Sequence, residues 1–116
     1  MAVVSGNPGA AGQFTIQLSM PAGYHIPPHF HPTDEHVKVI QGTFLFGMGD
    51  KLDLTKAAVM SVGDTGTVMA KAHHFGAAKG ATIVSVTAMG PFAMTYVNPK
   101  DDPTKATAAA GNSSGY

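Results

Sequence analysis

The stretch "PPHFHPTDEH", residues 27–36, places three histidines and one glutamate directly behind two prolines. His29, His31, Glu35 and His36 fall here, although the chain of 116 residues has only six histidines and Glu35 is its single glutamate. Neutral imidazoles and a carboxylate that meet on a buried face are unfavourable unless a cation lies between them. The stretch therefore predicts a metal site.

The spacing within this stretch assigns the side chains to faces. His29 and His31 are two residues apart, so on a strand both project from the same face. Pro32 ends that strand, and the "PTD" that begins with it is typical of a turn. The next strand begins at Glu35, so a hairpin can direct its carboxylate back at the two histidines. His36 points to the opposite face and is expected to meet solvent or an interface.

A further ligand would have to come from "HHF", residues 73–75, since the remaining histidine, His25, is expected at the rim of the site. Neighbours on a strand point to opposite faces, so only one of His73 and His74 can enter the site. The alternation of the strand does not say which of the two it is.

Strand signals dominate the rest of the chain. Residues 13–20, "QFTIQLSM", alternate apolar and polar side chains, and several later segments are rich in β-branched and aromatic residues. Turn signals separate these segments every eight to twelve residues or so. The segments predicted as strands are residues 13–20, 35–41, 42–49, 81–89 and 91–98. Only residues 53–60, "DLTKAAVM", favour a helical turn. The chain is thus predicted to be all-β, a sandwich or barrel.

The composition narrows the class of protein. Seven lysines balance seven acidic residues, which gives no reason to expect nucleic acid or a membrane as a partner. There is no arginine, which disfavours a site built for phosphate or carboxylate groups. The absence of cysteine excludes disulfides and thiolate ligands, so a metal would be held by imidazole and carboxylate.

The chain length suits one domain, residues 1–98, followed by a polar tail, residues 99–116, expected to lie on the surface or be disordered. The first residues carry no signal-peptide pattern, and no apolar run approaches the length of a membrane helix. We expect a soluble protein, with the cytoplasm and the periplasm both left open.

Gly23, His29, His31, Glu35 and Gly42 follow one another at intervals of five, one, three and six residues. This run resembles the first motif of the cupin superfamily at every position. Parts of the chain further resemble a group of small single-domain bacterial cupins of uncharacterised activity. The resemblance spans residues 12–98.

The second cupin motif is matched only at its ends. Gly63 and His74 fit, whereas Met69 stands where the motif has proline and Lys71 where it has glycine. The resemblance implies that His74, rather than His73, is the further ligand.

The resemblance implies a small antiparallel β-barrel of the cupin type, also called a double-stranded β-helix or jelly roll, with a metal in its mouth. The cofactor would be one divalent transition metal, which we take to be Mn, Fe, Ni or Zn. A homodimer is also implied, and the apolar Ile40 on a predicted strand face agrees with it. The implied ligands are His29, His31, Glu35 and His74.

A metal-dependent enzyme is the favoured function, with oxygenase, isomerase or lyase chemistry on a small, largely apolar organic molecule. Met69, Phe75 and Phe44 are the candidate pocket residues, and His73 and Lys71 are weak catalytic candidates. The alternatives are a module that binds a small ligand without catalysis, and a cupin whose metal is structural.

Overall fold

The computed structural model describes residues 2–101. The chain is built from short strands, as predicted, with two single turns of 3-10 helix. The elements in chain order are β1 (Ala2–Ser5), β2 (Gly12–Met20), β3 (His25–Phe30), β4 (Glu35–Gln41), β5 (Phe44–Met48), η1 (Leu54–Lys56), β6 (Ala58–Met60), β7 (Thr65–Val68), β8 (His74–Ala78), β9 (Thr82–Gly90), β10 (Thr95–Tyr96) and η2 (Pro99–Asp101).

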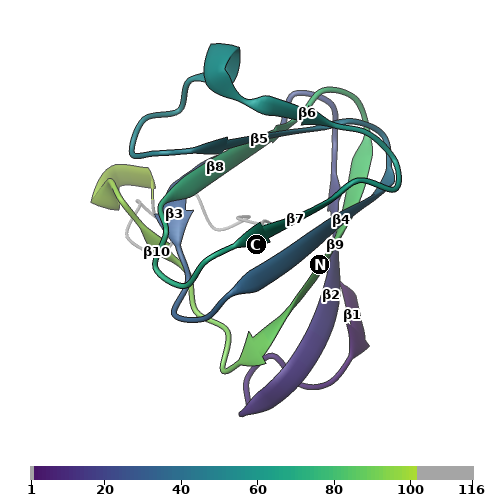
Figure 1. Cartoon of the computed structure of the whole chain (residues 1–116), viewed down its shortest axis with the longest axis vertical. Coiled ribbons are helices and arrows are strands. Elements are labelled where there is room, and N and C mark those ends of the chain that lie inside the picture. Colours follow the sequence, from purple (N-terminus) through teal and green to yellow (C-terminus); the bar gives the residue numbers. More distant parts are fainter. Residues whose placement is uncertain (1, 102–116) are drawn as a thin grey trace.

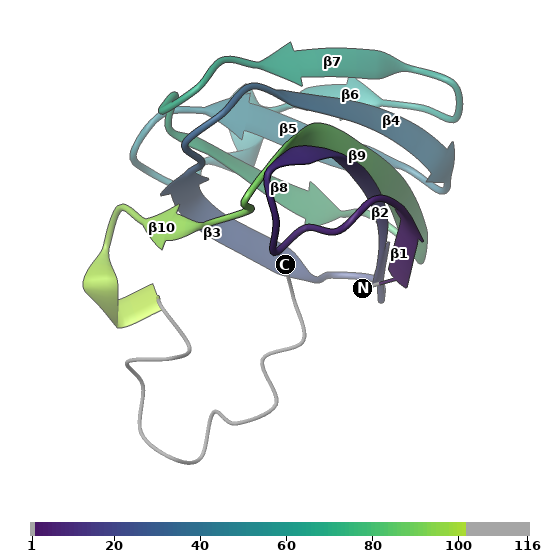
Figure 2. The same cartoon turned by 90° about the horizontal axis from the view of Figure 1, so that it is seen from below.

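The strands form two antiparallel five-stranded sheets that face each other (Figure 1). One sheet has the order β1-β2-β9-β4-β7, and the other has the order β10-β3-β8-β5-β6. Figure 2 shows the same two layers from below, with β10 at the edge beside β3. From β2 to β5 and from β6 to β10, successive strands alternate between the two sheets, which is the arrangement of a jelly roll.

The prediction of a closed barrel is wrong in one respect, because the described strands form two separate sheets rather than one closed cylinder. All four edge strands are short: β1 and β7 have four residues each, β6 has three and β10 has two. Such short edges cannot supply a continuous ladder from one sheet to the other. The fold is therefore an open, sandwich-like jelly roll.

The core lies between the two sheets and follows the alternation that the sequence predicts. On β2, Phe14, Ile16, Leu18 and Met20 are buried, while the residues between them are half-buried or exposed. Inward side chains from β4 and β9 complete this layer, and those of β3, β5, β6 and β8 face it. The buried cluster comprises Phe14, Ile16, Leu18, Met20, Ile26, Val37, Val39, Phe44, Met60, Ala78, Val84, Val86 and Ala88.

Two of the local predictions need correction. Within residues 91–98, only Thr95–Tyr96 is a strand. Pro91 has no N–H to donate, and the N–H of Phe92 donates to the carbonyl of Pro8 rather than to a ladder. Within residues 53–60, the predicted helical turn is limited to η1, after which β6 begins.

The predicted tail lies largely outside the described part of the chain, which ends at residue 101. Residues 99–101 form η2, and residues 102–116 are outside the described residues. The division into a domain and a tail at residue 98 therefore stays a prediction. Among residues 2–101, no helix is long and apolar enough to cross a membrane.

Candidate metal centre

Three histidines come together from β3, from the residue after it and from β8. His29 on β3 is the direct register partner of His74 on β8, so both imidazoles belong to the same sheet. His31 follows β3 at the turn into β4. Glu35 begins β4 in the opposite sheet, where it pairs with Ala88 and Val68. The site therefore bridges the two sheets at one end of the jelly roll.

The imidazoles are close enough to share one ion. One ring nitrogen from each of His29, His31 and His74 lies within 4.8 Å of the others. Glu35 contacts two of them, with its Oε2 3.1 Å from His31 Nε2 and its Oε1 3.6 Å from His74 Nε2. All four side chains are at most 3% exposed. The geometry thus brings together the four residues that the cupin resemblance implies.

The second nitrogen of each imidazole is held by a backbone carbonyl. Nδ1 of His29 lies 2.8 Å from the oxygen of Pro27, Nδ1 of His31 lies 2.8 Å from that of Ala93, and Nδ1 of His74 lies 3.0 Å from that of Ala72. A carbonyl oxygen only accepts, so each Nδ1 must carry the proton and donate it. In the neutral ring, Nε2 then keeps its lone pair, which is the form that binds a metal.

Burial keeps His29 and His31 neutral. Burial, and to a smaller extent the neighbouring His74, lower the pKa of His29 to about 2. Burial also lowers the pKa of His31, although the carboxylate of Glu35 acts in the opposite direction. Neutral imidazoles with a carboxylate beside them are a donor set that suits a divalent transition metal.

The interior behind this cluster is almost filled. A cavity of approximately 10 Å³ borders His29, Glu35 and His74, which is about the space of one water molecule. Its walls are otherwise apolar, apart from the backbone of a glycine. The remaining lining residues are Ile26, Val37, Phe44, Phe46, Phe75, Gly76, Val84 and Val86.

Of the three candidate pocket residues, two border this cavity and one does not. Phe44 and Phe75 border this cavity, whereas Met69 is 64% exposed and does not line it. Phe75 itself packs tightly over Gly47, where any side chain would collide with its ring. Met69 lies between β7 and β8, in a loop that faces solvent, so its position in the second motif does not direct it into the core.

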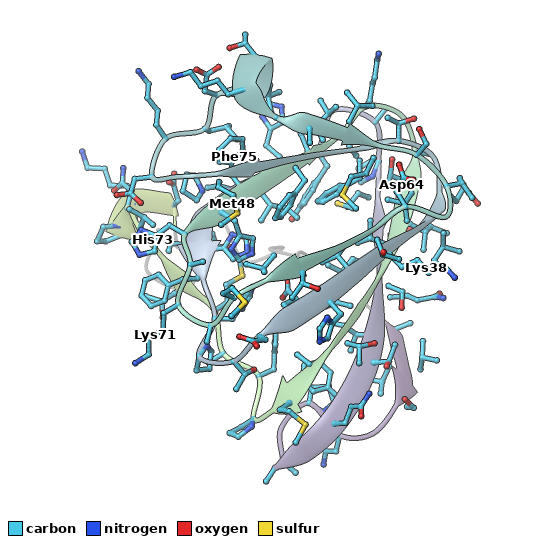
Figure 3. All side chains as sticks on the ribbon, viewed as in Figure 1. Lys38, Met48, Asp64, Lys71, His73 and Phe75 are labelled. Carbon is cyan, nitrogen blue, oxygen red and sulfur yellow. The ribbon has the colours of Figure 1, made fainter. Side chains whose placement is uncertain are left out.

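The two weak catalytic candidates lie on the outside. His73 is 38% exposed and does not line the cavity. Its Nδ1 donates a hydrogen bond to Asp50 Oδ1, and its ring stacks on Phe30. Lys71 is exposed, and Figure 3 shows both side chains at the outer edge of the molecule. Alternation of neighbouring residues explains the position of His73, which directly precedes β8, because His74 takes the inward direction.

The other two histidines are exposed, as predicted. His36 points away from the cluster, and its Nδ1 lies 3.1 Å from Thr67 Oγ1 on the neighbouring strand. His25, at the start of β3, is exposed and is not in the three-histidine group.

The turn before His74 has a left-handed backbone conformation at the position where the second motif has glycine. Lys71, which stands in place of glycine, has φ 65° and is the single non-glycine residue with positive φ in residues 2–101. Its N–H donates to the carbonyl of His31 (2.8 Å). The N–H of Ala70 donates to Asp34 Oδ1 (2.6 Å). These two bonds fasten the turn that carries His74 to the turn that carries His31 and Glu35.

Sequence reasoning missed two groups that support the site. The sequence pattern places Asp34 only in a turn. The signal that points to its supporting role is its position directly before Glu35. Ala93, which holds His31 through its carbonyl, carries no sequence signal because any residue offers that oxygen.

Comparison with known proteins supports the fold. No protein-family model matches the sequence, and no curated protein gave a significant match. Among solved structures, an RmlC-like cupin protein from Desulfovibrio desulfuricans is 20% identical, with a TM-score of 0.60 over 76% of this chain and 78% of that chain. A cupin superfamily protein from Desulfitobacterium hafniense is 17% identical, with a TM-score of 0.62 over 77% and 73%.

One of the similar solved structures is an enzyme. A DMSP lyase from Ruegeria pomeroyi is 20% identical, with a TM-score of 0.67 over 78% of this chain. The match covers 46% of the lyase, so this chain spans about half of its length. At these identities the likeness concerns the fold alone. The chain has the fold of a small cupin, and the fold implied by the resemblance is thereby confirmed.

Proposed function

We propose that this protein is a metal-binding small cupin in which His29, His31, Glu35 and His74 hold one divalent transition metal. The observation that carries the proposal is the set of three bonds from histidine Nδ1 to backbone carbonyls. They leave Nε2 as the nitrogen of each neutral ring that can bind a metal, beside the buried carboxylate of Glu35. Metal-binding histidines usually have such a partner on their second nitrogen.

The donor set fits manganese, iron, nickel or zinc, and does not favour one of them. Three imidazoles and one carboxylate also leave coordination positions for water or a substrate, as an enzyme requires. When bound, the metal would supply Lewis-acid chemistry, or oxygen activation if it is iron. Glu35 would then serve as a ligand rather than as a general base.

The proposed reaction is an oxygenase, isomerase or lyase reaction on a small, largely apolar organic molecule. The apolar walls beside the cluster, including Phe44, Phe46 and Val86, support such a substrate. The DMSP lyase among the similar structures supports an enzyme in general terms and does not specify the reaction.

A structural metal is the second candidate, and the small cavity favours it. A space of approximately 10 Å³ holds no organic molecule, so the closed form shown here admits a metal and at most one water. A metal in such a centre would join the two sheets through Glu35 and the three histidines and would stabilise the fold without catalysis.

A homodimer is also proposed, since Ile40 is 40% exposed on the outer face of β4. Sedimentation at several protein concentrations would test it. A single monomeric species at all concentrations would exclude it.

The metal content of protein purified without an affinity tag tests the central proposal. The parent is compared with His31→Ala and Glu35→Ala, with His36→Ala as the matched control because His36 is exposed on the opposite face. Near-stoichiometric metal in the parent and the control, lost in the other two variants, supports the site. A parent that binds none of the four metals, and gains no stability from them, contradicts it.

A second experiment, on the metal-loaded parent protein, distinguishes a catalytic metal from a structural one. Cobalt-substituted protein is titrated with azide, and the visible spectrum reports whether an exogenous ligand reaches the metal. A spectral change supports an open coordination position and hence the enzyme. An unchanged spectrum at saturating azide supports the structural metal.

A further inference from the structure

Residues 91–97, which we call the cover, lie directly over the histidine cluster. Phe92 stacks on His31, with ring centroids 5.0 Å apart and an interplanar angle of 26°. The carbonyl of the next residue, Ala93, accepts the bond from His31 Nδ1. Tyr96 approaches His29 from the same segment, at 6.3 Å between centroids. The cover therefore contacts two of the three histidines.

The cover is paired with the rest of the fold over a short length only. Its strand, β10, has two residues and pairs only with β3, at the edge of the sheet. Further bonds join Phe92 N–H to the carbonyl of Pro8 and Val97 N–H to the carbonyl of Pro28. Phe92 also packs edge-on against Phe14, at 5.4 Å.

Apart from the turn before His74, which supplies the carbonyl of Ala72, the other neighbours of the cluster belong to strands inside the sheets. β8 pairs on both sides, with β3 and β5, and β4 pairs on both sides, with β9 and β7. Separating any of these strands would break a ladder of several hydrogen bonds. Segments with few backbone bonds and short pairing open at a lower free energy than such strands.

We infer that the cover is the gate of the metal centre and that Ala93 is a positioning residue for His31; this inference rests on the proposed metal site. With the cover closed, Ala93 fixes the tautomer and orientation of His31, and the cluster is sealed from solvent. When the cover lifts, Phe92 leaves the face of His31 and opens a path to the cluster. The same movement releases the bond that orients His31, so access and metal affinity are coupled.

A reversible tether across β10 and β3 tests the gate. Thr95 and Phe30 are direct register partners, and the chain has no cysteine, so Thr95→Cys with Phe30→Cys can form a single disulfide. The double variant is loaded with Co²⁺, and release to excess EDTA is followed by visible absorption. Its reduced and alkylated form is the matched control, because it carries the same two substitutions without the tether.

We expect cobalt release to be about tenfold slower in the disulfide form than in the alkylated form, since opening must precede release. Equal rates in the two forms, with stoichiometric cobalt in both, would overturn the gate and leave the metal site intact. Failure of the parent itself to bind cobalt would overturn the proposed function and the gate together.

Phe92→Ala provides a second test that needs no disulfide. Removing the ring that stacks on His31 should speed cobalt release by about tenfold and alter the cobalt spectrum, because His31 loses its fixed orientation. Tyr24→Ala is the matched control, since Tyr24 is also a partly buried aromatic residue packed against the core but does not line the cavity at the cluster. Equal acceleration in both variants would show a general loss of packing and contradict the role of the cover. If Phe92→Ala does not fold, the tethered protein, which retains Phe92, decides the question.

Discussion

His31 Nε2 lies 3.1 Å from Glu35 Oε2, and both side chains are almost completely buried. Because His31 Nδ1 already donates its proton to Ala93, a neutral His31 turns a lone pair towards the carboxylate. Two acceptors at this distance repel each other unless a proton or a metal ion lies between them. The metal-free site is therefore expected to be electrostatically unfavourable, and its substitutions should have opposite effects with and without metal.

Glu35→Gln should stabilise the metal-free protein and weaken metal binding. The amide can donate to His31 Nε2 and removes a buried charge, which should raise the free energy of unfolding by about 1 kcal/mol or more. Loss of a charged ligand should reduce metal affinity by at least about tenfold. Thermal unfolding with and without added Zn²⁺ measures both effects. A variant that is less stable without metal and keeps the parent's response to zinc would contradict this view.

The stability of the metal-free protein should fall as the pH is lowered from about 7 to 5. Burial lowers the pKa of His29 from 6.5 to about 2, and it also lowers the pKa of His31. Below pH 6.5 the unfolded chain therefore binds protons at these positions that the folded chain does not bind. The free energy of unfolding then decreases by up to about 1.4 kcal/mol per pH unit for His29, and His31 contributes in the same direction.

Denaturant unfolding at a series of pH values measures this slope. His29→Gln is the comparison, because it removes one of the two titrating groups and should give a shallower slope. A parent whose stability is constant between pH 7 and 5 would contradict the burial of neutral imidazoles.

Lys71→Gly should stabilise the protein. Lys71 has φ 65°, a conformation that glycine adopts without strain, and its N–H bond to His31 does not depend on the side chain. We expect a gain of about 1 kcal/mol in the free energy of unfolding. Metal affinity should be unchanged, because the turn keeps its shape. A loss of stability would show that the lysine side chain makes a contribution larger than the strain.

Gly47→Ala should destabilise the protein by about 1–3 kcal/mol. A methyl group there would collide with the buried ring of Phe75, which cannot move without disturbing the sheet. Gly80→Ala is the matched control, since its methyl group would meet nothing within 4 Å. Chemical denaturation of the two variants measures the difference. Equal stabilities would mean that Phe75 is less tightly packed than the structure indicates.

Sequence patterns predict β2, β4, β5 and β9 and most of the candidate cluster, whereas they do not predict β1, β6 and β7 as strands. The alternation of Phe14, Ile16 and Leu18 predicts β2, because a half-buried strand must alternate regardless of its neighbours. The two-residue spacing of His29 and His31 likewise places them on one face. For His74, alternation left two choices, and the resemblance to the cupin motif selected the residue that the structure turns inward.

Only the tertiary structure decided how the cluster is closed. The extended, aromatic-rich residues 91–98 predicted a strand, whereas the structure uses most of them as a cover whose carbonyl at Ala93 orients His31. It also showed that the sheets do not close into a cylinder and that Met69 faces solvent. These features depend on contacts between segments distant in sequence and on backbone atoms that all residues share. Local residue patterns carry no information about such contacts.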